Sequence, residues 1–541
     1  MLMKRIFSIL LVCLLLTGCG GEKTSEAPSP ETTPVQIAAD SPEGKASLPY
    51  RSRFDAVTEI TLSDDGMLMT DSDFLSITND IIYYEDREAY DSGNPYGEGS
   101  EEERHTAEEA AAHTVLNITR PGAYRVTGKL SKGQLRVDLG EDACEDPDAV
   151  VELILDNADI TCTVAPAILF LNVYECDEDA SEETATAEVD TSAAGANLIL
   201  EGQNTVKGSH VAKIFKDKDG EKKLWKQDGA IYSYQSLNVF GPGSLALTAD
   251  NEGLDTELHL TIFGGDITIR SGNDGINTNA DGVSVTTING GNLTIFAGLG
   301  AEGDGIDSNG YLVINGGNVF SSAKPASDAG LDSDLGSFIH GGTVIALGSA
   351  MDWAESDSRQ VTMNLQFAEQ QAAGSKITVR DPGSSEYITF ETDREHARPF
   401  SGLILSHPGF VQGATYHVYV DDTQMAYTGT DMGRGGHGGM GQPPEMPEGM
   451  GFPQGERPEP PEDFDPGKMG GKGTHPQNRE DRTPPEGFDG EMPTWPEGKA
   501  PEMPEGGFGG RVEGIPGSGE PRTDFYMNDK VNAFSNVVTV N

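Results

Sequence analysis

The chain has 541 residues, and its 88 acidic side chains outnumber its 37 basic ones, which gives a formal net charge of −51. A charge of this size repels nucleic acid phosphates and anionic lipid headgroups, so neither is expected as a direct partner. The 68 glycines and the 7% aromatic content are typical of a repetitive β protein with a low-complexity segment. They disfavour an enzyme built on a large α/β core.

The N-terminal segment has the features of an export signal. The apolar run from Ile6 to Leu16 is too short to persist as a membrane-spanning helix. It ends in Leu16-Thr17-Gly18-Cys19, which resembles a bacterial lipobox; the alternative is an ordinary signal peptide that happens to contain a cysteine. We predict a lipoprotein signal peptide over 1–18 and lipidation of Cys19. The protein is then extracytoplasmic, anchored to the cell membrane by lipid alone and exposed at the cell surface. Residues 19–54, rich in Pro, Ser, Thr and Glu, are predicted to be a disordered tether.

From about residue 55 the chain consists of short strand-like segments separated by polar loops. Three charged segments, 86–112, 176–194 and 213–226, are predicted to be insertion loops at the corners of a repetitive fold. Cys144, Cys162 and Cys176 have no metal-ligand or redox spacing, so we expect small buried residues rather than functional thiols.

A repeat of about 25 residues extends from Asp228 to Ser349. Each copy combines a Gly-Gly turn with a Gly-apolar-Asp/Asn corner, and apolar and polar residues alternate around the glycines. The Gly-Gly turns are 264–265, 290–291, 316–317 and 341–342, and the corners are Glu252–Asp255, Asp274–Asn277, Asp304–Asp307 and Ala329–Asp332. Alternation with period 2, broken by glycines at fixed offsets, fits coils of three short strands and three bends. Glycine suits such bends because it tolerates positive φ. We therefore predict an all-β fold with a parallel β-helix over 55–358.

The C-terminal part of the chain is expected to close the repeats. Alternating segments within 359–430 are predicted to form antiparallel strands of a small C-terminal β cap. Residues 431–522 contain mostly Gly, Pro, Met and Glu and are predicted to be disordered. Residues 523–541 regain strand character and are predicted to return to the cap.

Several segments resemble a known family. Asn117–Leu130, Val151–Ile160 and Ala196–Val206, together with the Asp-Gly-Ile corners and the lipobox-like motif, are similar to the bacterial carbohydrate-binding β-helix lipoproteins. The resemblance covers roughly residues 55–430. It implies a right-handed parallel β-helix (a β-solenoid with a pectin-lyase-like shape) and non-catalytic binding of cellulose-like or polygalacturonate-like polysaccharide. It also implies bound calcium.

The acidic corners are candidate calcium ligands on chemical grounds as well. Equivalent residues of stacked coils lie about 4.8 Å apart, so their carboxylates repel one another unless a cation lies between them. By the period-2 rule these side chains point outward, and Ca²⁺ prefers carboxylate, amide and carbonyl oxygens. The alternative is that they only form turns, bonded to their own backbone, without a metal. The candidate ligands are Asp255, Asp274, Asn277, Asp304, Asp307 and Asp332.

Aromatic side chains are candidates for stacking on a neutral glucan. These are Tyr232, Tyr234, Tyr311 and Trp353, whereas Phe240 is expected to pack internally. No catalytic residue is predicted, and the leading hypothesis is a monomeric polysaccharide-binding protein. Two alternatives stay open. A calcium-dependent polysaccharide lyase needs a strand-borne base, for which Arg270 is the candidate. A surface adhesin or structural protein would instead bind another protein.

Overall fold

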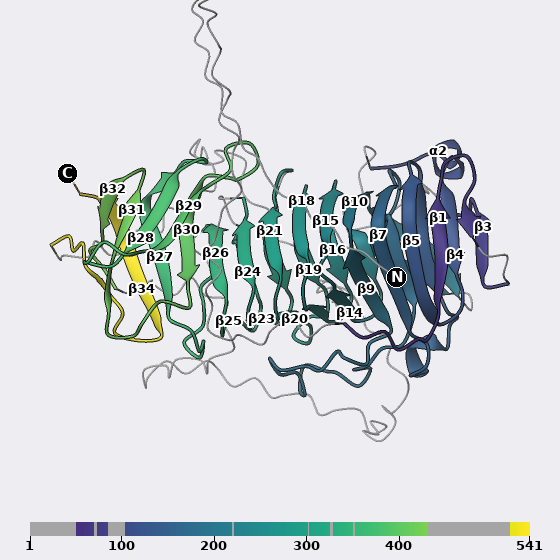
Figure 1. Cartoon of the computed structure of the whole chain (residues 1–541), viewed down its shortest axis with the longest axis horizontal. Helices are drawn as coiled ribbons and strands as arrows, with labels where there is room; N and C mark the ends of the chain where they lie inside the picture. Colours follow the sequence, from purple (N-terminus) through teal and green to yellow (C-terminus); the bar gives the residue numbers. More distant parts are fainter. Residues whose placement is uncertain are drawn as a thin grey trace, which may run out of the picture.

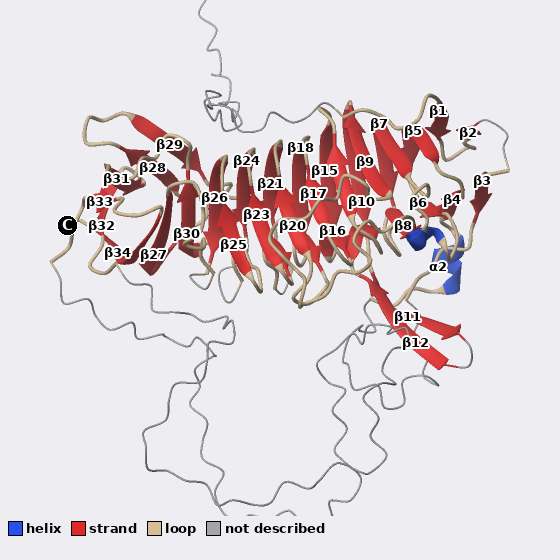
Figure 2. Cartoon of the chain, turned by 90° about the horizontal axis from the view of Figure 1, so that it is seen from below, coloured by secondary structure: helices blue, strands red, loops and turns tan. Residues whose placement is uncertain are grey.

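The computed structural model describes residues 50–69, 73–84, 103–218, 221–300, 302–324, 328–349, 352–430 and 520–540. Within these ranges the protein is nearly all β, which confirms the predicted class; the helices are α2 (Ala107–Ala111) and a 3-10 turn (Ala143–Glu145). The strands follow one another along an elongated stack (Figure 1, Figure 2). The predicted signal peptide with Cys19 and residues 431–519 of the predicted disordered segment lie outside the described residues. None of the described helices is long and apolar enough to cross a membrane.

Three columns of parallel strands extend along the stack, and the repeats from β13 to β24 each add one strand to each column. The first column contains β9 (Ala196–Glu201), β14 (Leu237–Phe240), β17 (Leu260–Ile262), β20 (Val285–Ile288), β23 (Tyr311–Ile314) and β25 (Gly336–Ile339). The second contains β10 (Gln203–Gly208), β15 (Ser244–Ala249), β18 (Asp266–Ser271), β21 (Asn292–Phe296), β24 (Asn318–Ser322) and β26 (Thr343–Gly348). The third contains β4 (Thr114–Ile118), β6 (Gly133–Asp138), β8 (Ile168–Asn172), β13 (Gly229–Ser233), β16 (Glu252–Thr256), β19 (Ile276–Thr278) and β22 (Ile306–Ser308).

The N-terminal end of the stack is built from longer strands. β1 (Val57–Leu62), β5 (Gly122–Leu130) and β7 (Val151–Thr161) pair in parallel, and β7 then pairs with both β9 and β10. Two short strands, β2 (Leu68–Met69) and β3 (Leu75–Thr78), pair antiparallel with β1 and β4. The first two columns therefore join into one sheet through β7.

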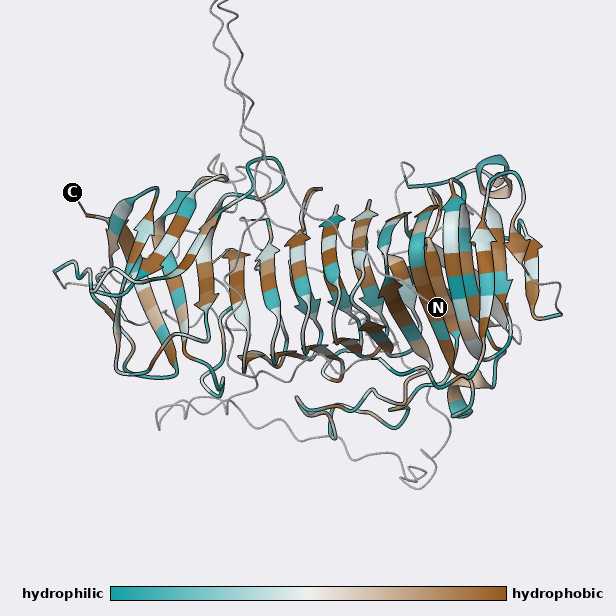
Figure 3. Ribbon diagram, in the orientation of Figure 1, coloured by the Kyte–Doolittle hydropathy of each residue, from teal (hydrophilic) through white to brown (hydrophobic). Residues whose placement is uncertain are grey.

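The core is a stack of apolar side chains in register. In the second column Leu247, Ile269 and Ile295 are successive partners, and each is fully buried. In the third column Leu254 is followed by Ile276 in the same way. Burying one such side chain stabilises the fold by about 1.5–3 kcal/mol. Figure 3 shows the resulting alternation of hydrophobic and hydrophilic bands along the strands of the second column.

Two sets of glycines shape each repeat, for two different reasons. The second glycine of each Gly-Gly turn has positive φ, for example +108° at Gly265 and +87° at Gly291, as predicted. The corner glycines do not; they are required by the close approach of neighbouring repeats. A Cβ added at Gly275 would lie 2.2 Å from Ile295 Cγ2 and 2.5 Å from the carbonyl oxygen of Gly305. The prediction that glycine is needed for its positive φ was therefore correct at the Gly-Gly turns. It was wrong at the corners, where glycine is needed because neighbouring repeats approach closely.

The C-terminal strands cover the last repeat. β26 pairs antiparallel with β30 (Phe400–Ser406), which also pairs antiparallel with β27 (Thr362–Gln371). The remaining strands are β28 (Lys376–Arg380), β29 (Glu386–Glu391), β31 (Thr415–Val420), β32 (Thr423–Ala426), β33 (Phe525–Tyr526) and β34 (Val531–Thr539). β34 pairs in parallel with β27, so the chain end returns to these strands. They enclose a second apolar cluster that includes Phe367, Phe400 and Phe534.

Two of the predicted loops contain regular structure. The charged segment 213–226 lies almost entirely in an antiparallel hairpin of β11 (Val211–Lys218) and β12 (Glu221–Gln227), which projects from the stack (Figure 2). Charged and apolar residues alternate in this segment, which is typical of a strand, but its high charge led us to predict a loop. The segment 86–112 ends in α2, which Thr106 and Glu109 cap reciprocally. Cys162 is buried as expected, but Cys144 and Cys176 are only half-buried.

Substitution of a corner glycine tests the close approach of the repeats. We expect Gly275→Ala to lower the free energy of unfolding by about 1–3 kcal/mol, because its methyl group overlaps Ile295 and Gly305. Chemical denaturation of the purified protein measures the change. The control is Gly383→Ala, where the nearest atom to the new Cβ is a side-chain oxygen of Asp381 at 3.2 Å. Equal stability of the two variants would contradict the packing argument.

Candidate cation site in two stacked carboxylate rows

The first row of candidate ligands follows the third column. Asp255 of β16, Asn277 of β19 and Asp307 of β22 are register partners, as the repeat predicted. Asp332 continues the row, since its backbone N–H donates to the Ile306 carbonyl at 2.8 Å. Each of these residues follows an inward-facing apolar residue, so all four side chains leave the coil on the same side.

A second row consists of the residues that precede the corner glycines. Asp228, Glu252, Asp274 and Asp304 occupy this position in successive repeats, and their backbones are joined by hydrogen bonds. For example, Glu252 N–H donates to the Asp228 carbonyl at 3.1 Å, and Gly275 N–H donates to the Asp304 carbonyl at 3.0 Å. Asp228 and Glu252 were not among the predicted ligands. The recurrence of an acid directly before Gly229, Gly253, Gly275 and Gly305 was the signal that identifies them.

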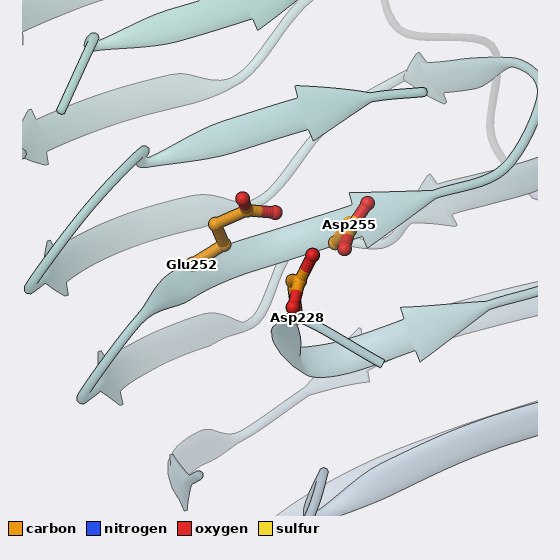
Figure 4. Close-up of side chains that lie close together, drawn as sticks. All are labelled: Asp228, Glu252 and Asp255. Carbon is orange, nitrogen blue, oxygen red and sulfur yellow. The ribbon is translucent and has the colours of Figure 1, made fainter. Parts of the chain in front are cut away.

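The two rows meet at an acidic triad. Ligand oxygens of Asp228, Glu252 and Asp255 all lie within 4.8 Å of one another (Figure 4). Lys226 Nζ lies 2.6 Å from Asp228 Oδ2, and it supplies one positive charge against three carboxylates. The triad is also buried: Asp255 is fully buried, and Glu252 is 4% exposed. We expected the corner side chains to face solvent, and this was wrong for Asp255 and Asn277. Asp255 is packed against Asp228 and Asn279, and Asn277 is 7% exposed and donates to Glu252.

Several oxygens of this cluster lack hydrogen-bond donors. Among the described residues, Asp255 Oδ2 and Asn277 Oδ1 are buried and accept no hydrogen bond, and Gln227 Oε1 nearby in sequence is in the same state. A buried polar atom without a partner costs about 1–3 kcal/mol. A hard cation that takes oxygen ligands would satisfy such atoms, so the residues present fit Ca²⁺.

The turn-forming alternative is supported at two positions of the second row. Asp274 Oδ1 accepts the backbone N–H of Asp304 at 2.7 Å, and Asp304 Oδ1 accepts the backbone N–H of Ala329. One oxygen of each carboxylate thus caps the next repeat. These bonds leave the second carboxylate oxygen of each residue for another ligand, so turn formation and cation binding are compatible here.

Burial and neighbouring carboxylates raise the pKa values of five carboxyl groups in the rows: Glu252, Asp255, Asp274, Asp304 and Asp307. Desolvation first, and repulsion by Asp255 and Asp228 second, raise the pKa of Glu252 well above its usual range. Desolvation first and repulsion by Asp274 second raise the pKa of Asp304 to about 9. Desolvation first and repulsion by Asp332 second raise the pKa of Asp307 to about 7. Asp352, which the repeat pattern could not identify, lies beside Asp332, and its pKa is raised to about 8. Without a cation, these carboxyl groups therefore bind protons at higher pH than exposed carboxyl groups do.

The predicted aromatic residues do not form one platform. Tyr232 is fully buried and donates its hydroxyl hydrogen to Glu257, so its prediction as a sugar-stacking residue was wrong. Tyr234 is half-buried against the Tyr232 ring, with centroids 5.1 Å apart. Tyr311 belongs to the first column, and Trp353 packs against the main apolar core after β26. Phe240 stacks on Phe263 at 4.5 Å, in agreement with its predicted packing role.

The family model and the curated relative that match this chain share one description. A family model described as carbohydrate-binding domain-containing protein matches residues 112–385, about half of the chain. A protein of that description from Acetivibrio thermocellus is 31% identical over 157 residues, which are 29% of this chain and 45% of the relative. This chain therefore spans less than half of that relative. A solved structure of the polysaccharide lyase-like protein from C. thermocellum, a gadolinium derivative, matches with 22% identity and a TM-score of 0.33, over 53% of this chain and 93% of that chain.

The raised pKa values predict an unusual pH dependence in the presence of chelator. The native carboxyls bind protons more tightly than the unfolded chain does, so stability present near pH 4 is lost as pH rises through about 7 to 9. We expect the melting temperature in chelator to be about 5 °C lower at pH 8 than at pH 5. Asp304→Asn should reduce this difference, because the amide keeps the acceptor for Ala329 without the charge.

The control for this experiment is Asp148→Asn, which removes an exposed carboxylate far along the chain from both rows. This variant should retain the full difference in melting temperature between pH 5 and pH 8. A wild-type protein whose melting temperature is higher at pH 8 than at pH 5 in chelator would contradict the proton-binding account.

Proposed function

We propose, since the chain belongs to the family of carbohydrate-binding domain-containing proteins, that it binds polysaccharide at the cell surface without cleaving it. The observation that carries the proposal is the extent of the family match. Residues 112–385 include the three columns from β4 to β26 and both carboxylate rows. The polymers to be tested first are cellulose-like and polygalacturonate-like. Lipidation of Cys19 would hold the protein at the membrane.

The finer architecture that we propose is a right-handed parallel β-helix closed by β27 to β34. Three parallel columns with one strand per repeat support the helical winding. The antiparallel pairing of β30 with β26 supports the role of the C-terminal strands as a cap. Such a fold presents long rows of equivalent side chains, which suits binding to a polymer with a repeating unit.

We further propose that the carboxylate rows hold Ca²⁺. One set of ligands would be Asp228, Glu252, Asp255 and Asn277, and a second set would be drawn from Asp304, Asp307, Asp332 and Asp352. Bound Ca²⁺ would neutralise the buried carboxylates and could accept oxygen atoms from a sugar. The support for this proposal is the set of buried oxygens without donors at Asp255 and Asn277.

Calcium should stabilise the protein at neutral pH. We expect millimolar Ca²⁺ to raise the melting temperature of the wild-type protein by about 5 °C at pH 7.5, because the ion binds the native state and not the unfolded chain. The double variant Glu252→Gln/Asp255→Asn should lose most of this response, whereas Asp148→Asn should keep it. Equal increases in the melting temperature of the wild type and the double variant would show that the ion binds at another site. No increase in either protein would show that calcium does not bind the native state.

Sedimentation with insoluble cellulose and with insoluble calcium pectate tests the binding function. We expect the protein to leave the supernatant with at least one of these polymers, and to release no unsaturated oligosaccharide from polygalacturonate. Ultraviolet absorbance of the supernatant detects such product. If the wild type releases unsaturated product and Arg270→Ala does not, the protein is a lyase and the binding proposal is wrong. A protein that stays in solution with both polymers would favour an adhesin.

A further inference from the structure

Three basic side chains contact β21 or the loop that follows it. Arg270, Lys324 and Arg398 come from the end of β18, the residues after β24 and the segment before β30. We call them the basic cluster. Its members are all half-buried, so solvent and a ligand can reach them. In a chain with 37 basic and 88 acidic residues, such a group is not expected from composition alone.

An aromatic residue on the neighbouring strand supports Arg270. Phe296 of β21 is the register partner of Arg270 on β18, and Arg270 Cζ lies 5.6 Å from the centre of its ring. The His396 ring, from the segment before β30, also contacts Phe296, with ring centres 5.5 Å apart. Phe296 is 5% exposed, so it is a support for the guanidinium and not a surface on which a sugar stacks.

The other two members are fixed around the loop that follows β21. Arg398 donates from Nε and Nη2 to the Gly298 carbonyl at 3.0 and 2.6 Å. Lys324 donates from its backbone N–H to the Gly303 carbonyl at 3.2 Å, and its Nζ lies 3.4 Å from the Gly300 carbonyl. The same loop is bonded to the corner of the previous repeat, because Gly298 N–H donates to the Asn273 carbonyl at 3.0 Å.

No carboxylate neutralises these three charges within the part of the chain that the structure describes. Other basic side chains of the stack are paired: Arg125 with Asp156, Lys129 with Asp159 and Lys226 with Asp228. The Arg270 side chain also makes no hydrogen bond among the described residues, which leaves its five N–H donors for solvent or a ligand. Nearby carboxylates are abundant, so the lack of an ion pair here points to an anion supplied from outside.

We infer that the basic cluster is a subsite for the carboxylate groups of an acidic polysaccharide, a polyuronate; this inference rests on the proposed function. A guanidinium binds a carboxylate through two parallel N–H donors, and Lys324 adds a second positive charge close by. Arg270 also precedes Asp274 of the second row by four residues in the same corner. A cation held by the row would reduce the repulsion between an acidic chain and the neighbouring carboxylates.

The experiment compares two double variants of the full mature chain that remove the same charge. Arg270→Gln/Lys324→Gln removes two members of the cluster. Arg359→Gln/Lys376→Gln removes two basic residues that pair elsewhere, with Glu188 and Asp422, each at 3.2 Å. Affinity for polygalacturonate is measured by calorimetry in calcium buffer at fixed ionic strength, with sedimentation on cellulose and binding to dextran sulfate as parallel arms. Thermal melting establishes that both variants are folded.

We expect the cluster variant to bind polygalacturonate at least about tenfold more weakly than the wild type, since two charge-assisted contacts are lost. The control variant should change less than about twofold, and binding to cellulose should be unaffected by either. The affinity of Arg270→Lys for polygalacturonate should lie between those of the wild type and the cluster variant, because lysine keeps the charge and loses the paired donors.

Three results would overturn the inference in different ways. Equal weakening in both double variants would show an effect of net charge alone. If the wild type binds cellulose but not polygalacturonate, the subsite inference is wrong and the proposed function still holds. If it binds neither polymer, both the inference and the proposed function are wrong. Tighter binding to dextran sulfate, lost in the same cluster variant, would show a general anion site that does not select carboxylates.

Discussion

The spacing between successive repeats is the constraint on which the acidic site depends. Strands of one column lie about 4.8 Å apart, and the corner glycines bring neighbouring backbones into direct contact. At Gly275 and Gly305 there is no room for even a methyl group. Residues on either side of these glycines must therefore repeat at the strand spacing, and acidic residues at those positions must stack on one another whatever their electrostatic cost.

That cost must be offset by protons or by cations. Asp255 and Glu252 are buried, and Lys226 alone supplies a positive charge to their cluster among the described residues. Desolvation first, and repulsion by neighbouring carboxylates second, raise the pKa values of both carboxyls, so protonation is one way in which the native state neutralises them. A divalent cation is the other. Folding stability, pH and cation binding are thereby linked through the same side chains.

The repeats also carry charges of both signs. The carboxylate rows follow the third column and its corners, and the basic cluster begins at the end of the second column. Asp274 and Arg270 belong to the same bend. A polymer with regularly spaced acidic groups could engage cations held by the rows and the guanidinium at once. Its repeating unit would match a protein surface that itself repeats.

The sequence was sufficient to predict the repeat, the all-β class and the alignment of Asp255, Asn277 and Asp307, because glycine spacing fixes the register of a repetitive fold. It was not sufficient to predict burial. Tyr232 has the pattern of an exposed residue, yet side chains from adjacent repeats enclose it. Asp352 joins the site through a connection outside the repeat, and the β11–β12 hairpin resembles a charged loop in composition. Each of these features depends on contacts between segments that no local pattern records.

Calorimetric titration with calcium in two buffers of different ionisation enthalpy tests the central claim most directly. If the stacked carboxyls hold protons when no cation is bound, calcium binding near pH 7 must release protons, and the measured heat must differ between the buffers in proportion. Glu252→Gln/Asp255→Asn should reduce the number of protons released. Calcium binding without proton release, or no calcium binding at all, would contradict the account.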